Sequence, residues 1–216
     1  MSAFDSSVFR ALPASYFARD PRDVAPDLLG YVLVSSAGGV ATGGRIVEAE
    51  AYLGTNDPGS HASTREITRR NAVMYGPPGS VYVYFAYGNH HMVNVVCCPE
   101  GEAGAVLIRA LEPLYGIEEM HRRRGGRSER ELANGPGKLA QALGIDLSDN
   151  GTLLGGGRLV VYDSPGPRPQ KIAVSGRVGL SAGHHLQLRY FVEDCPFVSR
   201  GRIGPVRRTT RPRTAP

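Results

Sequence analysis

The sequence contains no tryptophan and almost no lysine, and these scarcities narrow its possible functions. Lys138 and Lys171 are the only lysines among 25 basic residues, so arginine supplies nearly all of the net charge of +5. Arginine favours planar, bidentate contacts with phosphate, which favours a polyanionic partner. Arginine-rich codon usage in a GC-rich genome would give the same composition. The lack of tryptophan argues mildly against sugar binding, and the arginine excess argues against neutral glycans.

Cysteine and long apolar runs are also scarce. The three cysteines, Cys97, Cys98 and Cys195, form an odd set without a C-x-x-C motif. They predict a reduced protein without a zinc site. No run approaches the roughly 18 apolar residues that a membrane span needs, and the first residues lack a secretory pattern. We therefore expect a cytoplasmic protein, associated with the nucleoid if it is bacterial, that has no membrane partner.

The distribution of glycine and proline predicts one folded domain. With 216 residues, 41% of them hydrophobic, the chain is long enough to bury a sizeable core. We expect a flexible N-terminus at 1–12, a single domain at 13–202 and a basic, disordered tail at 203–216. Arginine-rich residues 122–130 predict a mobile loop. The main expected elements are a helix from Pro21 to Gly30 and strands at 31–34, 43–53, 81–86, 92–98, 103–110, 151–154, 159–162, 172–175, 186–192 and 197–198.

The strand expected at 43–53 carries two carboxylates on one face. Alternation places Glu48, Glu50 and Tyr52 together, opposite an apolar face. A half-buried strand with a solvated acidic side is the simplest interpretation. Arg109, near the end of an apolar run, must reach solvent or an acidic partner, and Glu48 or Glu50 is the natural candidate. Two neighbouring carboxylates are also compatible with a carbohydrate glycosidase.

The segment after this strand predicts a hairpin with an aromatic tip. Strands at 81–86 and 92–98 flank Tyr87-Gly88-Asn89-His90, whose glycine and asparagine suit a tight turn. This arrangement displays Tyr87. The other tyrosines, Tyr82 and Tyr84, are equally typical of ordinary strand residues with cross-strand partners.

One further segment suggests an anion contact. Asn134-Gly135-Pro136-Gly137-Lys138 precedes an apolar helical pattern, and the amides of a helix N-terminus favour anions. The spacing excludes a phosphate-binding P-loop. A single phosphate contact and an ordinary helix start both fit.

Several motifs, in order, suggest a family. They are Arg-Ile-Val-Glu-Ala-Glu-Ala-Tyr-Leu-Gly at 45–54, His61, Tyr-Val-Tyr-Phe-Ala-Tyr-Gly at 82–88, Asn94, Leu-Ile-Arg-Ala-Leu-Glu-Pro at 107–113, Gly-Pro-Gly-Lys-Leu at 135–139 and Arg-Val-Gly at 177–179. Each motif is weak alone, but the ordered set is specific. From about residue 28 to residue 198 the chain resembles the alkyladenine (3-methyladenine) DNA glycosylase family.

The resemblance implies a fold and a reaction. The fold is α+β: a single mixed domain around a curved, mainly antiparallel sheet with flanking helices and a protruding, DNA-intercalating hairpin. The reaction is base-excision repair. A purine such as 3-methyladenine, 7-methylguanine, hypoxanthine or ethenoadenine is flipped out of double-stranded DNA from the minor-groove side, and its N-glycosidic bond is hydrolysed to leave an abasic site. The resemblance implies a monomer without lyase activity, metal or cofactor.

The resemblance also implies roles for individual residues. Glu50 would activate the attacking water with help from Arg109, and Tyr87 would fill the gap in the base stack. The other implied contacts are Tyr52, His61, Tyr84, Asn94 and the Leu180 carbonyl around the extruded base, and Lys138, Arg69 and Arg70 on the DNA backbone. This chain departs from some relatives by carrying Asn89, His90 and His91 after the tip tyrosine. A nucleic-acid-binding module without catalysis is the alternative function.

Overall fold

The structure, a computed structural model, describes residues 4–64, 66–86, 88–163, 168–201 and 207–210. Its α-helices in these ranges are α1 (Pro21–Asp27), α2 (Ile117–Arg124), α3 (Glu129–Leu132) and α4 (Pro136–Leu143). Its strands are β1 (Arg10–Ala11), β2 (Val32–Ser35), β3 (Thr42–Tyr52), β4 (Val81–Ala86), β5 (His90–Val96), β6 (Ala105–Tyr115), β7 (Leu159–Asp163), β8 (Lys171–Ser175), β9 (Arg189–Val192) and β10 (Arg207–Thr210). None of the helices in the described ranges is long and apolar enough to cross a membrane.

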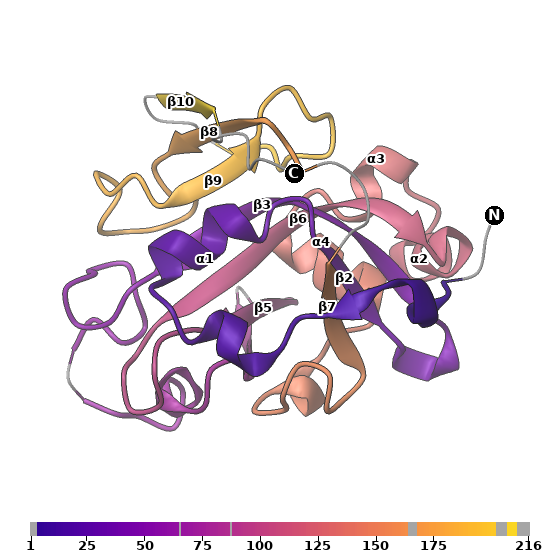
Figure 1. The fold of residues 1–216 in the computed structure, drawn as a ribbon. Coiled ribbons are helices and arrows are strands. Elements are labelled where there is room, and N and C mark those ends of the chain that lie inside the picture. Colours follow the sequence, from indigo (N-terminus) through magenta and orange to yellow (C-terminus); the bar gives the residue numbers. More distant parts are fainter. Residues whose placement is uncertain (1–3, 65, 87, 164–167, 202–206, 211–216) are drawn as a thin grey trace.

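The strands form one antiparallel sheet that branches at β3. The main path runs β1-β7-β2-β3-β6-β5-β4. The first half of β3 pairs with β2, whereas Glu48–Glu50 pair with β9, which leads on to β8 and β10. In Figure 1 this branch, in orange and yellow, lies above the remainder of the sheet. The curled antiparallel sheet with its helices confirms the predicted α+β fold.

Irregular pairing between β3 and β6 bends the sheet at this branch. The register shifts at Gly43/Gly44 and on both sides of Glu48, and such bulges bend a strand and increase its twist. Gly44 meets β6 so closely that an added Cβ would lie 2.3 Å from the Glu112 carbonyl oxygen. A glycine is therefore required there for close contact between the strands.

β3 is buried on both faces. Its apolar residues, including Ile46 and Ala49, join a core with Leu28 after α1 and Ile108 on β6. Glu48 and Glu50 point the other way, yet both are fully buried. The half-buried strand with a solvated acidic side is thus wrong, because the chain that follows β8 and β9 contacts both carboxylates on that face, through the Val178 amide and through Ser199.

Several local sequence signals are confirmed. Helix α1 starts with Pro21, and the Asp20 carboxylate accepts a hydrogen bond from the Arg22 amide at 2.8 Å, as an N-cap does. β4 and β5 pair from Val81↔Val95 to Ala86↔His90 as a hairpin, but the return strand runs from His90 to Val96 and not over the predicted 92–98. The tip residue Tyr87 lies outside the described residues, and so does Arg65.

Two further segments differ from the prediction. The strand expected at 103–110 continues to Tyr115, because a bulge in β6, with Leu114 as the extra residue, places Pro113 opposite Gly44 and accommodates a residue that donates no ladder hydrogen bond. The loop expected at 122–130 instead contains the last turn of α2 and the start of α3. Arg122 and Arg123 bind Glu119 at 2.6 and 2.8 Å, which orders that turn.

The chain ends are also more structured than expected. Residues 4–12 are not loose: β1 pairs with β7, and the Phe4 ring lies 5.2 Å from those of Phe9 and Tyr162. Within the predicted tail at 203–216, residues 207–210 form β10, which departs from the expectation of disorder. The strand expected at 151–154 is reduced to an isolated bridge between Ser80 and Leu153, and the one at 197–198 does not form.

Candidate active site: an aromatic pocket beside two buried carboxylates

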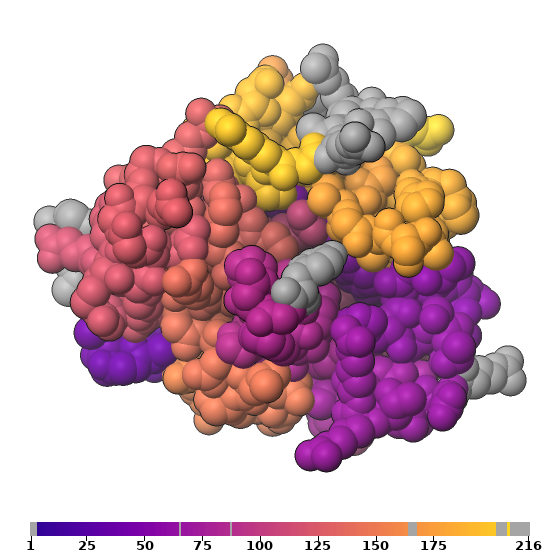
Figure 2. All heavy atoms as spheres, turned by 180° about the vertical axis from the view of Figure 1, so that it is seen from behind, coloured from indigo at the N-terminus to yellow at the C-terminus, as the bar shows by residue number. Residues whose placement is uncertain are grey.

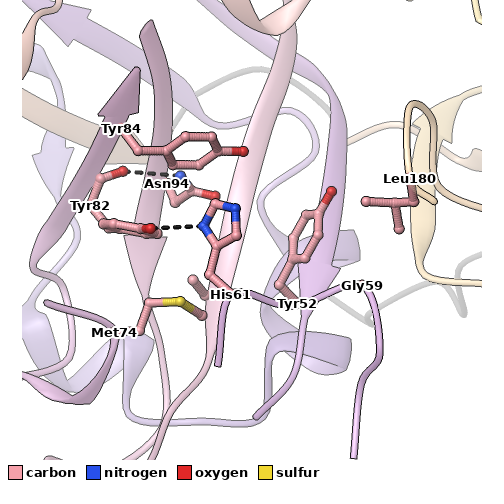
Figure 3. Close-up of a pocket in the computed structure, with 9 residues that line it drawn as sticks. Tyr52, Gly59, His61, Met74, Tyr82, Tyr84, Asn94 and Leu180 are labelled. Atoms are coloured by element: carbon pink, nitrogen blue, oxygen red, sulfur yellow. Dashed lines mark hydrogen bonds between the residues drawn. The ribbon is translucent and has the colours of Figure 1, made fainter. Parts of the chain in front are cut away.

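A pocket opens where β3, β4 and β5 meet the loops after β3 and β8. Figure 2 shows this face of the molecule, with the hairpin in magenta between the purple segment near residues 54–75 and the orange-yellow segment near 176–188. The pocket is lined by Tyr52, Gly59, His61, Met74, Tyr82, Tyr84, Asn94, Ala105 and Leu180. All five residues that the resemblance assigned to the extruded base therefore line a single pocket (Figure 3).

Contacts among aromatic residues fix one wall of the pocket. The His61 Nδ1 lies 2.8 Å from the Tyr82 hydroxyl. The Tyr84 ring packs edge-on against the His61 ring, with centroids 4.6 Å apart and an interplanar angle of 74°. Figure 3 shows Tyr52 facing this wall from the other side, with Leu180 beyond it. The pocket thus offers aromatic surfaces on two sides.

His61 is held in its neutral form. Burial, together with the charge of Arg70, lowers the pKa of His61 to about 4. A guanidinium can only donate, so the Nε2 of His61, 3.1 Å from the Arg70 guanidinium, is the acceptor. The proton of the neutral ring is therefore on Nδ1 and is donated to the Tyr82 hydroxyl. The His61 ring itself consequently carries no positive charge at neutral pH.

Tyr52 connects the pocket with the carboxylates. The Arg177 guanidinium lies 4.5 Å from the centre of the Tyr52 ring and is paired with Asp57, and both partners are fully buried. The Tyr52 hydroxyl donates to a Glu50 oxygen at 2.9 Å. Burial and the nearby Glu50 charge raise the pKa of Tyr52 well above its usual value, so the phenol keeps its proton and acts as a donor.

Glu50 lies directly behind that hydroxyl and accepts three hydrogen bonds. Its Oε2 receives the Tyr52 hydroxyl and the Arg109 guanidinium, the latter at 3.1 Å. Its Oε1 receives the Val178 amide at 2.8 Å. Since every neighbour donates, the site accommodates the carboxylate rather than the acid. Each carboxylate oxygen offers about two acceptor positions, so Oε1 can still accept a hydrogen bond from a water.

Arg109 joins the two carboxylates, as the burial argument predicted. Its Nε donates to Glu48 at 2.8 Å while its terminal nitrogen donates to Glu50. The guanidinium is itself buried, and it bridges the strand face that carries both acids. The sequence named Glu48 or Glu50 as its partner, and the structure shows both.

Glu48 accepts more hydrogen bonds than Glu50, and none of them comes from a residue of the pocket. Its Oε1 accepts from Arg109, from Arg189 at 2.7 Å and from the Ser199 hydroxyl, and its Oε2 accepts from the Ser199 amide. Burial opposes its ionisation, but Arg109 and Arg189 outweigh burial and hold the pKa of Glu48 below its usual value. Glu50, by contrast, is bonded to the pocket residue Tyr52. This geometry favours Glu50 over Glu48 for chemistry and weakens the two-carboxylate glycosidase alternative.

Comparison with known families decides the classification. A family model described as "Methylpurine-DNA glycosylase (MPG)" matches residues 15–196. The chain belongs to this family. Membership places it among the DNA glycosylases, which are hydrolases of DNA repair, and makes DNA its partner.

Curated relatives of this family member cover nearly its whole length. A protein of Carboxydothermus hydrogenoformans is 48% identical over 190 residues, 88% of this chain and 98% of the relative. Proteins of Methanoculleus marisnigri and Chlorobium luteolum are 48% and 46% identical over 192 residues, which are 88% of this chain and 98% and 97% of the relatives. Each of the three is named "Putative 3-methyladenine DNA glycosylase".

The three residues expected to contact the DNA backbone differ from one another in their surroundings. Arg69 and Arg70 are exposed, and Arg70 lies at the edge of the pocket, 5.5 Å from the Tyr84 ring centre. Lys138 lies at the start of α4 and donates to the Asn134 side chain at 2.8 Å. Among the residues that the structure describes, no cluster of His, Cys, Asp and Glu could hold a metal ion.

Three residues that support the site were missed from the sequence: Arg177, Arg189 and Ser199. Arg189 carried a usable signal, because an arginine within an apolar strand requires an acidic partner just as Arg109 does. Arg177 was noted only as part of the Arg-Val-Gly motif. Ser199 has no sequence signal, because its contact with Glu48 depends on how the chain after β9 returns to β3.

Proposed function

We propose that this protein excises alkylated or deaminated purines from duplex DNA by hydrolysing the N-glycosidic bond with a water activated by Glu50. Its substrates would be of the 3-methyladenine, 7-methylguanine, hypoxanthine and ethenoadenine class. The observation that carries the proposal is Glu50 itself, a fully buried carboxylate held by three donors directly behind an aromatic pocket. Family membership gives the class of reaction, and this geometry supports the choice of residue.

The extruded purine would lie between Tyr52 on one side and His61 with Tyr84 on the other. Aromatic faces attract cations, so a purine that carries the positive charge of an alkyl group stacks better than an intact one. The neutral state of His61 is important here, because a protonated imidazole would repel such a base. The Tyr82 and Arg70 contacts of His61 support this state.

Flipping requires a residue to replace the base in the stack, and Tyr87 is proposed for this role from the minor-groove side. Extrusion costs a few kcal/mol and is least costly for damaged or mispaired bases. Stacking on an aromatic ring contributes about 1–3 kcal/mol per base, which offsets much of that cost. The described strands β4 and β5 converge on the tip that carries Tyr87, which supports this assignment.

Hydrolysis would proceed by water attack on C1′. The free acceptor position on the Glu50 Oε1 would take the water proton as the purine leaves, while Arg109 holds the carboxylate in place. The Leu180 carbonyl would be a second acceptor for this water. A positioned base of this kind contributes about 10² to 10⁴ in rate.

The products would be the free base and an abasic site, without strand cleavage by the enzyme. Lyase chemistry of the usual kind needs an amine nucleophile that forms a Schiff base with the sugar. No lysine is among the described residues that line the pocket, and Lys138 is bound to Asn134, which supports a monofunctional enzyme. We propose in addition that it acts as a monomer in the cytoplasm.

Two further contacts complete the proposal. The Asn94 amide donates to the Tyr82 carbonyl at 3.0 Å, which fixes its orientation in the pocket. From there it would oppose the exocyclic amine of an intact, uncharged guanine; 7-methylguanine carries the same amine, and its positive charge would offset this contact by stronger stacking.

Arg69, Arg70 and Lys138 would contact DNA phosphates, and the exposure of the two arginines supports this role.

The test is base release from labelled duplexes that carry a single hypoxanthine, a single ethenoadenine or randomly methylated purines. Hot alkali converts abasic sites into strand breaks. We expect breaks at the lesion with the wild type and none with Glu50→Gln, which keeps the size of the side chain but removes the base. Glu50→Gln should still bind the damaged duplex. Equal loss of binding and release would contradict catalysis by Glu50, and binding without breaks in the wild type would favour the non-catalytic module.

A further inference from the structure

The buried carboxylates form a charge-balanced group with two guanidiniums. Glu48 and Glu50 lie on β3, Arg109 on the neighbouring β6 and Arg189 on the opposite neighbour, β9. Arg189 is fully buried. Two negative and two positive charges therefore lie in the interior, where any imbalance is costly.

The other ionisable groups near Glu50 leave this balance unchanged. Arg177 is paired with Asp57, and together they are neutral. Tyr52 keeps its proton, because burial and the Glu50 charge raise its pKa. His61, on the far side of the pocket, is neutral. The balance at Glu50 is therefore set by Glu48 and the two arginines that bind it.

Within the described part of the chain, Arg189 makes no hydrogen bond or ion pair with Glu50, and it is not among the residues that line the pocket. Its Nε donates to Glu48, and its terminal nitrogens lie 3.3 Å from the Ser175 hydroxyl and 3.4 Å from the Ser199 carbonyl. Its guanidinium also lies 4.6 Å from the ring centre of Phe191. Glu48 is therefore the acidic group that the positive charge of Arg189 neutralises.

We propose that Arg189 is a positioning residue for catalysis: by neutralising Glu48 it leaves the charge of Arg109 available to hold Glu50 ionised. The inference rests on the proposed function, in which Glu50 is the base. Glu48 in turn fixes the Arg109 guanidinium through its Nε, so that a terminal nitrogen faces Glu50.

Removal of the Arg189 charge would upset the charge balance around Glu50. Two buried carboxylates would then share one guanidinium, and like charges in proximity favour uptake of a proton. Glu48, without Arg189, would draw more strongly on Arg109, and we therefore expect Glu50 to become ionised only at higher pH. Removing the Glu48 charge as well would restore balance, leaving Glu50 with Arg109. The double variant should therefore recover what the single variant loses.

The variants to compare are Arg189→Met, Arg189→Lys and the double variant Glu48→Gln/Arg189→Met. Arg45→Met is the matched control, since it removes one arginine from β3 whose partner, Glu112, lies outside this group. A substrate with 7-methylguanine is suitable because its base is already cationic and leaves without an added proton. Single-turnover rates across pH then report the ionisation of the catalytic base.

We expect the acid limb of the Arg189→Met profile to move up by about one pH unit or more, a shift typical of the loss of one nearby charge. Arg189→Lys keeps the charge and should keep the midpoint, although its rate falls as hydrogen bonds to Glu48 are lost. The double variant should return the midpoint to that of the wild type. A slower Arg189→Met enzyme with an unchanged midpoint would overturn the proposal and leave Arg189 a purely structural role.

A second readout separates this inference from the proposed function. With ¹³C-labelled glutamate carboxyls, the Glu50 resonance is assigned by its loss in Glu50→Gln and followed by NMR across pH in the intact protein. If it titrates at higher pH in Arg189→Met and returns in the double variant, the charge coupling holds even when the wild type releases no base. If it does not move, the inference fails while base release by the wild type stands.

Discussion

His61 shows how a single residue can be tuned by its neighbours. Its ring contacts the Tyr82 hydroxyl through one nitrogen and the Arg70 guanidinium through the other. The first contact fixes the ring in place, and the second excludes a proton from Nε2. The result is an uncharged, oriented aromatic face suited to a cationic purine.

The lowered pKa of His61 predicts a pH-dependent stability. The ring titrates near 6.5 when the chain is unfolded and at about 4 when it is folded. Between these values the unfolded state binds more protons, so stability rises with pH and is lost as pH falls from about 6.5 toward 4. We expect the wild type to lose more thermal stability over this window than His61→Asn, which cannot titrate.

The measurement is the difference in melting temperature between wild type and variant at pH steps from 8 to 4. His184→Asn, at an exposed histidine outside the pocket, is the control for removing a histidine as such. A constant difference between the wild type and His61→Asn across the window would contradict the neutral, desolvated ring. A difference that narrows as pH falls would support it.

The sequence located some site residues by physical argument and others only by resemblance. The cost of burying Arg109 without a partner correctly pointed to the carboxylates of β3. By contrast, His61 and Leu180 are 119 residues apart, and no local pattern brings them to one pocket. Their grouping was expected only because the ordered motifs resemble a family, since contacts between distant loops are set by the tertiary fold.

At the scale of elements, alternation and turn residues predicted β3 and the β4–β5 hairpin well. The misses lie where tertiary contacts override local preference. Pro113 is a reasonable strand end on propensity, yet the bulge opposite Gly44 keeps it within β6. Likewise, the acidic face of β3 looked solvated because the groups that bury it, such as the Val178 amide and Ser199, come about 130 to 150 residues later in the chain.

Helix α4 supports the hairpin near its tip through an unusually close contact. A Cβ added at Gly137 would lie 2.7 Å from the His90 Cγ, where β5 begins. Gly137 is buried, so the contact has no room to relax into solvent. The position of the hairpin that carries Tyr87 therefore depends on a glycine in the first turn of α4.

Gly137→Ala should displace the start of β5 and with it the hairpin. We expect a destabilisation of about 1–3 kcal/mol, typical of overpacking, and weaker binding to damaged duplex. Both are measured on one preparation, by chemical denaturation and by fluorescence anisotropy. Adding His90→Ala removes the Cγ overlap and should recover part of both losses. If the two substitutions were instead additive, the proposed steric coupling between α4 and β5 would be wrong.

At the scale of the whole molecule, charge is divided between ion pairs and free surface. Many arginines are committed to acidic partners, such as Arg122 to Glu119 and Arg10 to Asp163. The exposed Arg69 and Arg70 lie near the pocket instead, and no ion pair with an acidic residue is found for either within the described part of the chain. The count of 25 basic residues thus overstates the positive surface available to phosphate, and the net charge of +5 does not show where that surface lies.

This division predicts which charges bind DNA. Each phosphate contact lowers the slope of log affinity against log salt by about 0.9 on duplex DNA. Replacing Arg69 and Arg70 by Gln should therefore reduce the magnitude of the slope by about 1.8 if each makes one such contact. The double variant Arg10→Gln/Arg122→Gln removes the same total charge from ion-paired sites and should change the slope little. Equal reductions in both would show that DNA responds to total charge, and would rule out a phosphate contact specific to the rim of the pocket.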